Sequence, residues 1–148
     1  MRIDSINNEF KSLISDPEKY NTMILNLSDI SDESLQSQII RQIRAKILAG
    51  ELTSHSSLPS IRQLAKEQRI SVITVQRAYE NLMQQNLIHS RRGKGFFVSD
   101  LQRNKKKDMA FEHLKENLQK PLESALAEGL DAEDIMQTFL KVLEEIKK

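Results

Sequence analysis

The sequence predicts a mainly α-helical protein with one small β-hairpin and a short pair of helices at its C-terminus. Three observations favour this fold class. Apolar residues recur at spacings of three and four in several segments, which is the period of an amphipathic helix. Glycine and proline are sparse, with four and three among 148 residues. One pair of short β-prone runs flanks a glycine-containing turn, which is the pattern of a hairpin.

The chain begins with a predicted N-terminal helical extension over residues 1–22, which Asp16-Pro17 interrupts. A weak alternation over residues 22–26 indicates a short strand. The next helix is predicted from an apolar repeat every four residues and ends at Gly50, where a left-handed glycine belongs. Ser31 or Asp32 is its expected cap. The repeat consists of Leu35, Ile39, Ile43 and Ile47.

Two short helices joined by a four-residue turn are predicted between Ser60 and Gln85. Ser60 and Gln63 have the spacing of a capping box, and Ser71 caps the second helix, which Asn86 ends. Small and apolar side chains lie where two steeply crossing helices must touch, so this segment is predicted to be a helix-turn-helix. These contact positions are Leu64, Ala65, Ile70, Val75 and Ala78.

A hairpin is predicted directly after this motif, with its strands at residues 87–88 and 96–98. The preceding stretch Thr53–Ser57 is expected to be a loop. A hairpin in this place makes residues 23–101 a winged helix-turn-helix domain. The tip of the wing is basic and contains glycine: Arg91, Arg92, Gly93, Lys94 and Gly95.

Residues 102–148 are predicted to form a basic hinge over 102–107 and two helices, the second capped by Asp131. Two helices cannot bury their apolar stripe alone, so we expect a homodimer. Two alternatives remain open: the stripe packs on the chain's own winged domain, or it holds a small apolar effector. The candidate dimerisation residues are Phe111, Leu114, Leu118, Leu122, Ile135, Phe139 and Leu143.

The formal net charge of +1 conceals a segregation of charge along the chain. Residues 35–107 hold 14 Lys and Arg against four acidic residues, a net charge of +10. The segments 1–34 and 108–148 carry net charges of −4 and −5. A basic middle segment favours a nucleic-acid partner, although a charge run is also compatible with a solvated surface.

Several function classes lack their residues. The chain has no Cys, and its three histidines, at positions 55, 89 and 113, have no metal-ligand spacing. No catalytic constellation is visible, so we expect no enzyme, no metal and no cofactor. No apolar run reaches the ~18 residues of a membrane span, and no secretory signal is visible. We therefore expect a cytoplasmic protein without a membrane partner.

The second helix of the motif is expected to present Thr74, Gln76 and Arg77 to a major groove, whose base edges such groups can recognise. The cations of the wing can reach phosphates or an adjacent minor groove, and its glycines allow close approach of the backbone. Double-stranded DNA is therefore the predicted partner.

Six runs of the sequence resemble the DNA-binding domain of the GntR family of bacterial transcription regulators. They are Leu35 with Gln38-Ile39, Ile43-Arg44 with Ile47–Leu52, Leu58–Ala65, Ser71 with Thr74–Glu80 and Leu82, Leu87-Ile88, and Arg92–Val98. The resemblance covers about residues 24–98. The Thr74–Glu80 run and the short tail look most like the YtrA-like subfamily.

The resemblance implies a set of DNA contacts. Ser60 and Arg62 would contact phosphate and a base, and Ser71, Thr74 and Gln76 would face the major groove. Arg77 would support its helix or contact phosphate, with Lys94 and Gly95 at the wing tip. Two positions depart from the family: Val72 and Arg69 replace a frequent Arg and a frequent Gly. At Val72 a base contact is lost or replaced by an apolar contact to a thymine methyl.

The resemblance also implies a homodimeric regulator, in this subfamily often a repressor of a transporter operon, acting on a palindromic operator. The alternative is a winged-helix protein-interaction module without specific DNA recognition. The sequence identifies no effector.

Overall fold

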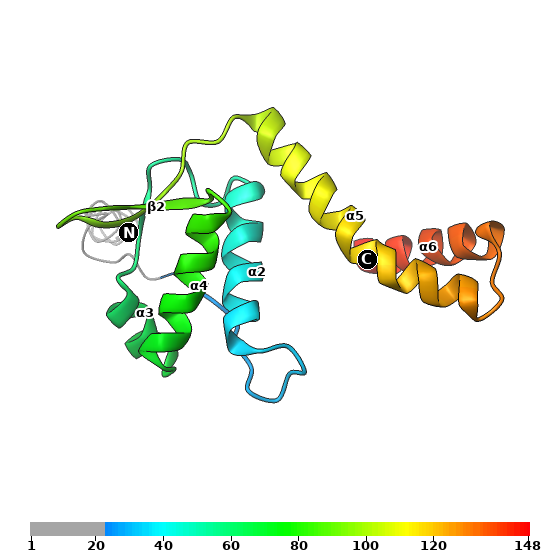
Figure 1. Ribbon diagram of the computed structural model, residues 1–148, viewed down its shortest axis with the longest axis horizontal. Helices are drawn as coiled ribbons and strands as arrows, with labels where there is room; N and C mark the ends of the chain where they lie inside the picture. The colour runs from blue at the N-terminus through cyan, green and yellow to red at the C-terminus, as the bar shows by residue number, and fades with distance from the viewer. Residues whose placement is uncertain (1–22) are drawn as a thin grey trace, which may run out of the picture. The chain divides into compact units, whose positions relative to one another are not determined.

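The structure is a computed structural model that describes residues 23–148; the predicted N-terminal extension lies outside them. The chain divides after Leu101 into two compact units. The first contains α2 (Leu35–Leu48), β1 (Ser57–Leu58), α3 (Ile61–Gln68), α4 (Val72–Gln84), β2 (Ile88–Arg91) and β3 (Gly95–Val98), and the second contains α5 (Arg103–Ala127) and α6 (Ala132–Lys147) (Figure 1). The mainly α-helical fold with a winged helix-turn-helix is confirmed.

The core of the first unit lies between α2 and α4, which pack along each other (Figure 1). The apolar repeat of α2 supplies Ile39, Ile43 and Ile47, all fully buried. α3 packs against α4 through Leu64 and Ala65, which are also buried. The contact predicted between the two helices of the motif is therefore confirmed. The other fully buried side chains of this core are Pro59, Val75, Ala78, Tyr79, Leu82, Leu87, Ile88 and Val98.

The wing is part of a three-stranded antiparallel sheet in the order β1-β3-β2, not a hairpin alone. β1 pairs with the outer edge of β3, with Ser57 opposite Phe97 and Leu58 opposite Phe96. The expected loop over residues 53–57 therefore ends in a strand. Two residues are too few to show the alternation that predicts a strand, and β1 forms because β3 offers unpaired backbone groups.

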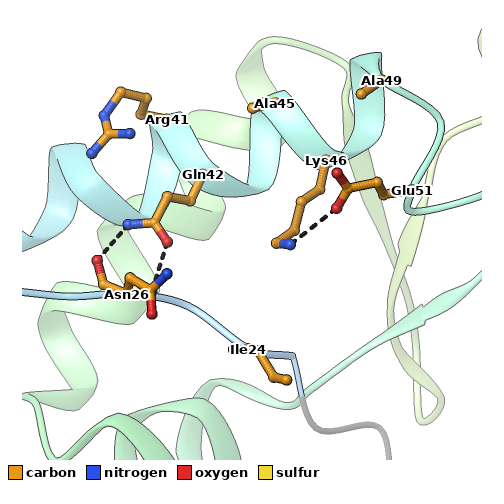
Figure 2. A pocket seen from close by; sticks show the side chains of 8 residues that line it. All are labelled: Ile24, Asn26, Arg41, Gln42, Ala45, Lys46, Ala49 and Glu51. Carbon is orange, nitrogen blue, oxygen red and sulfur yellow. Dashed lines mark hydrogen bonds and ion pairs between the residues drawn. The ribbon is translucent and has the colours of Figure 1, made fainter. Parts of the chain in front are cut away.

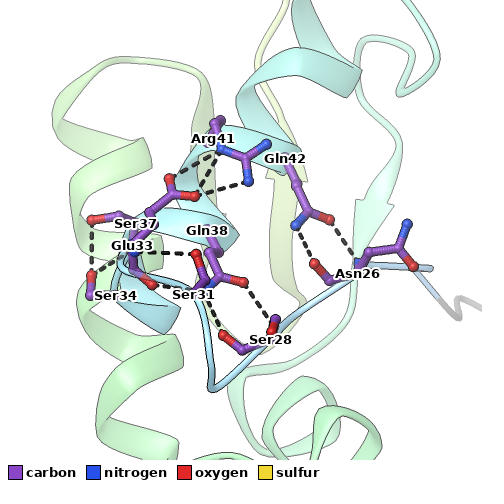
Figure 3. Close-up of polar contacts among 9 residues, drawn as sticks. All are labelled: Asn26, Ser28, Ser31, Glu33, Ser34, Ser37, Gln38, Arg41 and Gln42. Carbon is purple, nitrogen blue, oxygen red and sulfur yellow. Dashed lines mark hydrogen bonds and ion pairs between the residues drawn. The ribbon is translucent and has the colours of Figure 1, made fainter.

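The segment before α2 is extended but is not the strand predicted over residues 22–26. Its burial alternates as expected, with Met23 and Leu25 buried and Ile24 exposed. Its backbone partners are glutamine side chains of α2 instead of a neighbouring strand (Figure 3). The Gln42 amide accepts from Asn26 N at 2.8 Å and donates to Asn26 O at 2.7 Å.

Gln38 repeats this arrangement one turn earlier, where it is almost fully buried. Its Oε1 accepts from Ser28 N at 2.9 Å, and its Nε2 donates to Ser28 O at 2.9 Å and to Glu33 O at 2.7 Å (Figure 3). Residues four apart lie on the same face of a helix, so the two glutamines form a ladder for the passing chain.

The ends of the helices agree with most of the predicted signals. Gly50 and Asn86 adopt positive φ angles of 81° and 58° as predicted. The cap of α2 is Ser34, not Ser31 or Asp32, because Ser34 Oγ accepts from Ser37 N at 3.1 Å. Asp131 caps α6 as predicted.

The second unit consists of α5 and α6 alone. α5 begins at Arg103, so the predicted hinge over residues 102–107 is wrong. That stretch contains no glycine or proline, and Lys and Arg are good helix formers, so a basic run does not interrupt the helix. No residue from 102 to 148 is buried.

Candidate nucleic-acid interface

The helix-turn-helix begins both of its helices with a serine cap. Ser60 Oγ accepts from Gln63 N at 3.1 Å, and Ser71 Oγ accepts from Thr74 N at 3.3 Å. The predicted capping box at Ser60 is only half formed, because Gln63 Nε2 donates to Glu67 Oε1 at 2.9 Å. Each serine uses its oxygen as an acceptor and keeps a hydroxyl proton, which can be donated to a phosphate.

The turn between the two helices depends on a left-handed residue at Arg69, with φ 55° and ψ 45°. Its N–H donates to Lys66 O at 3.3 Å, and Ile70 N–H donates to Ala65 O at 3.0 Å. Both bonds complete the C-terminal end of α3. Arg69 stands where the family often has Gly, and a non-glycine residue in this left-handed conformation is modestly strained.

The outer face of α4 carries Gln76 and Arg77, both exposed as predicted. Gln76 Nε2 donates to Glu80 Oε1 at 3.1 Å, which holds the amide along the helix surface. Thr74 is only half-buried at the edge of this face. The exposed face also includes Ile73, which the sequence-based site omitted. Its position three residues before Gln76 and four before Arg77 is the signal that places it there.

The wing tip is a tight turn between β2 and β3. Lys94 N–H donates to Arg91 O at 2.9 Å, and the turn requires positive φ at Gly93, which adopts 73°. Arg92 and Lys94 are exposed in the turn. The Arg91 guanidinium lies 5.5 Å from the centre of the Phe97 ring, so this cation is anchored on the strand while the other two extend from the tip.

Tyr79 connects the parts of the interface. Its hydroxyl donates to Pro59 O at 2.8 Å, directly before the α3 cap, and its ring meets Phe96 of the wing edge-on at 4.9 Å. Burial raises the pKa of the Tyr79 hydroxyl, so it stays a donor at neutral pH. One side chain of α4 therefore fixes the position of both α3 and β3.

The exposed charges of α3, α4 and the wing are mostly positive. Two exposed acids lie on these elements, Glu67 and Glu80, and each accepts a hydrogen bond from a glutamine of its own helix. This surface therefore favours a polyanion. Its exposed cations are Arg62, Lys66, Arg69, Arg77, Arg91, Arg92 and Lys94.

A concave region lies beside α2, and none of the residues that line it belongs to α3, α4 or the wing (Figure 2). It is an open depression of about 450 Å³. Most of its polar side chains are already paired: Lys46 contacts Glu51 at 3.1 Å, Arg41 contacts Glu33 at 2.9 Å, and Gln42 bonds the backbone of Asn26. We therefore assign no ligand to this depression.

Residues 23–148 show neither a metal site nor a membrane-spanning helix. The acidic and histidine side chains there nowhere form a group of three placed to hold a metal ion. Over the same residues, every helix is too short or too polar to span a membrane.

The seven candidate dimerisation residues all lie on α5 and α6. Leu118 and Ile135 are half-buried, and the other five are exposed, with Phe111 at 59%. Large apolar side chains seldom remain exposed in such number along one pair of helices.

Three comparisons with known proteins agree with this geometry. Residues 35–98 match the bacterial regulatory proteins of the gntR family. The HTH-type transcriptional repressor NagR of Bacillus subtilis (strain 168) is 36% identical over 75 residues, which are 51% of this chain and 31% of NagR. The chain therefore spans less than a third of the length of NagR.

The HTH-type transcriptional repressor YtrA of the same organism is 24% identical over 124 residues, 84% of this chain and 95% of YtrA. The predicted resemblance to YtrA is thus confirmed over nearly the whole of that protein. A GntR family transcriptional regulator from Listeria monocytogenes has the same fold, with a TM-score of 0.66 and 23% identity over 78% of this chain and 98% of that one. Residues 35–98, which hold the helix-turn-helix and the wing, are thus the part of the chain that is similar to the gntR family of bacterial regulatory proteins.

Proposed function

We propose that this protein is a sequence-specific transcription repressor that binds a palindromic operator as a homodimer. The observation that carries the proposal is the exposed, basic surface that α3, α4 and the wing share. The match of residues 35–98 to the gntR family and the names of NagR and YtrA, both repressors, support the regulatory role. A protein-interaction module would not require the seven exposed cations that α3, the turn, α4 and the wing carry together.

The residues of this surface divide by chemistry. Gln76 on the outer face of α4 and Thr74 at the edge of that face are suited to hydrogen bonds with base edges in the major groove. Arg62 is suited to contacts with a phosphate and a base. The serine caps and Arg77 are suited to phosphates. The wing supplies cations for phosphates or the minor groove, and Gly93 and Gly95 let its backbone approach closely. The proposed DNA contacts are Ser60, Arg62, Ser71, Val72, Thr74, Gln76, Arg77, Arg91, Arg92, Gly93, Lys94 and Gly95.

The second unit supplies the proposed dimer contact. Most apolar side chains of residues 102–148 are exposed, and association with a second copy would cover this stripe. A two-fold dimer would place two α4 helices in successive major grooves, about 34 Å apart, on a palindrome. Residues 23–101 would then bind DNA while residues 102–148 hold the dimer together.

Gel-shift titration against a palindrome from the protein's own promoter region tests DNA binding. The triple variant Arg62→Ala, Gln76→Ala, Lys94→Ala is expected to lose at least tenfold in affinity, because each of these contacts is worth about 1 kcal/mol or more. The control is Lys46→Ala, on α2 and outside the proposed surface. Unchanged affinity in the triple variant would show that the proposed face is wrong.

Random DNA at physiological salt is the second arm of this titration. Equal affinity for the palindrome and for random DNA would favour the protein-interaction module. Sequencing the genes beside the bound operator then tests whether a transporter operon is regulated.

Sedimentation of the full chain tests the dimer separately. Phe139→Asp and Leu143→Asp place a charge in the stripe and are expected to yield a monomer. The matched control, Glu144→Asp on the same helix, is expected to remain a dimer. A monomeric parent protein would refute the assembly while leaving the DNA-binding face untouched.

A further inference from the structure

The outer face of α4 carries an apolar pair in its first turn. Val72 is 45% exposed and Ile73 is 61% exposed. The inner positions of α4 are filled by Val75, Ala78 and Leu82, so the fold of this unit makes no use of the pair. Two adjacent branched apolar side chains in water are unfavourable unless a partner covers them.

We propose that Ile73, together with Val72, contacts the 5-methyl groups of thymines in the major groove and selects thymine at those positions of each half-site. The proposal rests on the DNA-binding function proposed above. The thymine methyl is the apolar group that a base pair presents at the floor of the major groove. Neither side chain has a hydrogen-bonding group, so burial of that methyl is the means of selection.

The surroundings of the pair favour DNA over a protein as the occupant. Arg69 lies two residues before the α4 cap Ser71, Arg77 lies one turn beyond Ile73, and both arginines are exposed. The pair belongs to the segment of net charge +10, whereas the apolar stripe of α5 and α6 belongs to a segment of net charge −5. A cationic rim around an apolar patch matches phosphates on either side of base edges.

The pair is also continuous with the groups proposed to recognise bases. Ile73 and Gln76 are three residues apart on one helix face, about 5–6 Å between their Cβ atoms. This separation exceeds the ~3.4 Å rise of one base pair, so the two side chains can address adjacent or next-adjacent base pairs. Recognition by α4 would then combine a methyl contact with an amide contact.

Replacement of thymine by deoxyuridine tests the proposal, because it removes the methyl group alone. Operator duplexes are first selected from a random pool with the full chain. Each thymine of the best duplex is then replaced in turn, and the dissociation constant is measured. At one or two thymines per half-site the affinity should fall about fourfold, the effect of one buried methyl group.

The variant Val72→Ala, Ile73→Ala supplies the second arm. Both positions are exposed and alanine favours helix, so the fold should persist, as far-UV circular dichroism can verify. Thymine and uracil should bind this variant equally well. The matched control is Ile30→Ala, at a 97% exposed position before α2, which should keep the fourfold preference.

Three outcomes would overturn the proposal, and they are distinguishable. If the parent protein selects a sequence but binds every uridine duplex equally well, the inference alone fails. An undiminished thymine preference in the double variant would assign the methyl contact to other side chains and also refute it. If no sequence is enriched from the pool, the proposed function fails and this inference fails with it.

Discussion

Replacement of Gln38 by methionine should destabilise the winged unit by about 2–4 kcal/mol. The side chain is 2% exposed and makes three hydrogen bonds, to Ser28 N, Ser28 O and Glu33 O. Each such bond contributes about 0.5–1.5 kcal/mol net, and more where a buried partner is left unpaired. Methionine keeps the length and helix propensity of glutamine, so the loss reports the hydrogen bonds and not a cavity.

The matched control is Gln42→Met, one turn along the same ladder. Gln42 makes two bonds to Asn26 in a more exposed setting, where water can replace them. Its substitution should cost only about 0.5–1 kcal/mol. A cost below about 0.5 kcal/mol for Gln38→Met, or an equal cost for both variants, would refute the ladder as the support of this segment.

Native-state hydrogen exchange is the appropriate assay because the chain has two units. The Ile43 amide lies in the core of α2 and reports unfolding of the winged unit without contribution from α5 and α6. The Ser28 amide reports local opening of the extended segment. In Gln38→Met both should exchange faster, whereas in Gln42→Met the Ile43 amide should change little.

Three further predictions concern the interface. Tyr79→Phe removes the hydrogen bond to Pro59 O and should cost about 1–2 kcal/mol of unfolding free energy. Because burial raises the pKa of Tyr79, the parent should lose stability as the pH rises above about 10, where the unfolded tyrosine ionises first. Urea titrations of the variant should lack this loss of stability at high pH. Arg69→Gly removes the strain of the positive φ and should raise the free energy of unfolding by up to about 1 kcal/mol, and the melting midpoint with it. The same substitution should weaken DNA binding by loss of a cation, and a lower midpoint would contradict the strain. Lys94→Ala should reduce the slope of log affinity against log salt by about 1, while Gln76→Ala leaves it unchanged; equal slopes for the parent and Lys94→Ala would remove the wing tip from the phosphate backbone.

The helices of the winged unit could be predicted because their apolar residues repeat with the helical period. Ile39, Ile43 and Ile47 are four apart, and all three are buried in the structure. The turn residues could also be predicted, since Gly50 and Asn86 are the residue types that tolerate a positive φ. Local chemistry dictates these features, so a local pattern reveals them.

Features that depend on distant partners could not be predicted. β1 exists only because β3 passes beside it about 40 residues later in the chain, and two residues carry no period. The hydrogen bonds of Gln38 and Gln42 could not be predicted from the sequence, because their backbone partners Ser28 and Asn26 lie 10 and 16 residues away. From sequence, a glutamine on a helix is expected to lie at the surface. Only the structure shows that these two amides make the backbone hydrogen bonds that a neighbouring strand would otherwise make.

Ile73 was missed for a different reason. Polar and charged side chains indicate DNA contacts, and Val72 was included only because the family frequently has Arg there. Apolar side chains at helical spacing indicate core residues. Ile73 fits neither pattern, since it is apolar and lies on the face of Gln76 and Arg77. An apolar residue out of phase with the buried set of its helix is therefore a sequence signal for an external contact.

The two units of the chain depend on each other under the proposed function. One winged unit offers a single helix face and one wing, so it can make few base contacts, and each contact is worth about 1–3 kcal/mol. The second unit leaves most of its apolar side chains exposed, so association would stabilise it. Once the dimer forms, the second winged unit binds its half-site at a high effective concentration, which raises the affinity for the pair by ~10²–10⁴. Exposed apolar helices in the acidic segment thus supply the affinity that the small basic unit lacks, without adding a contact to DNA.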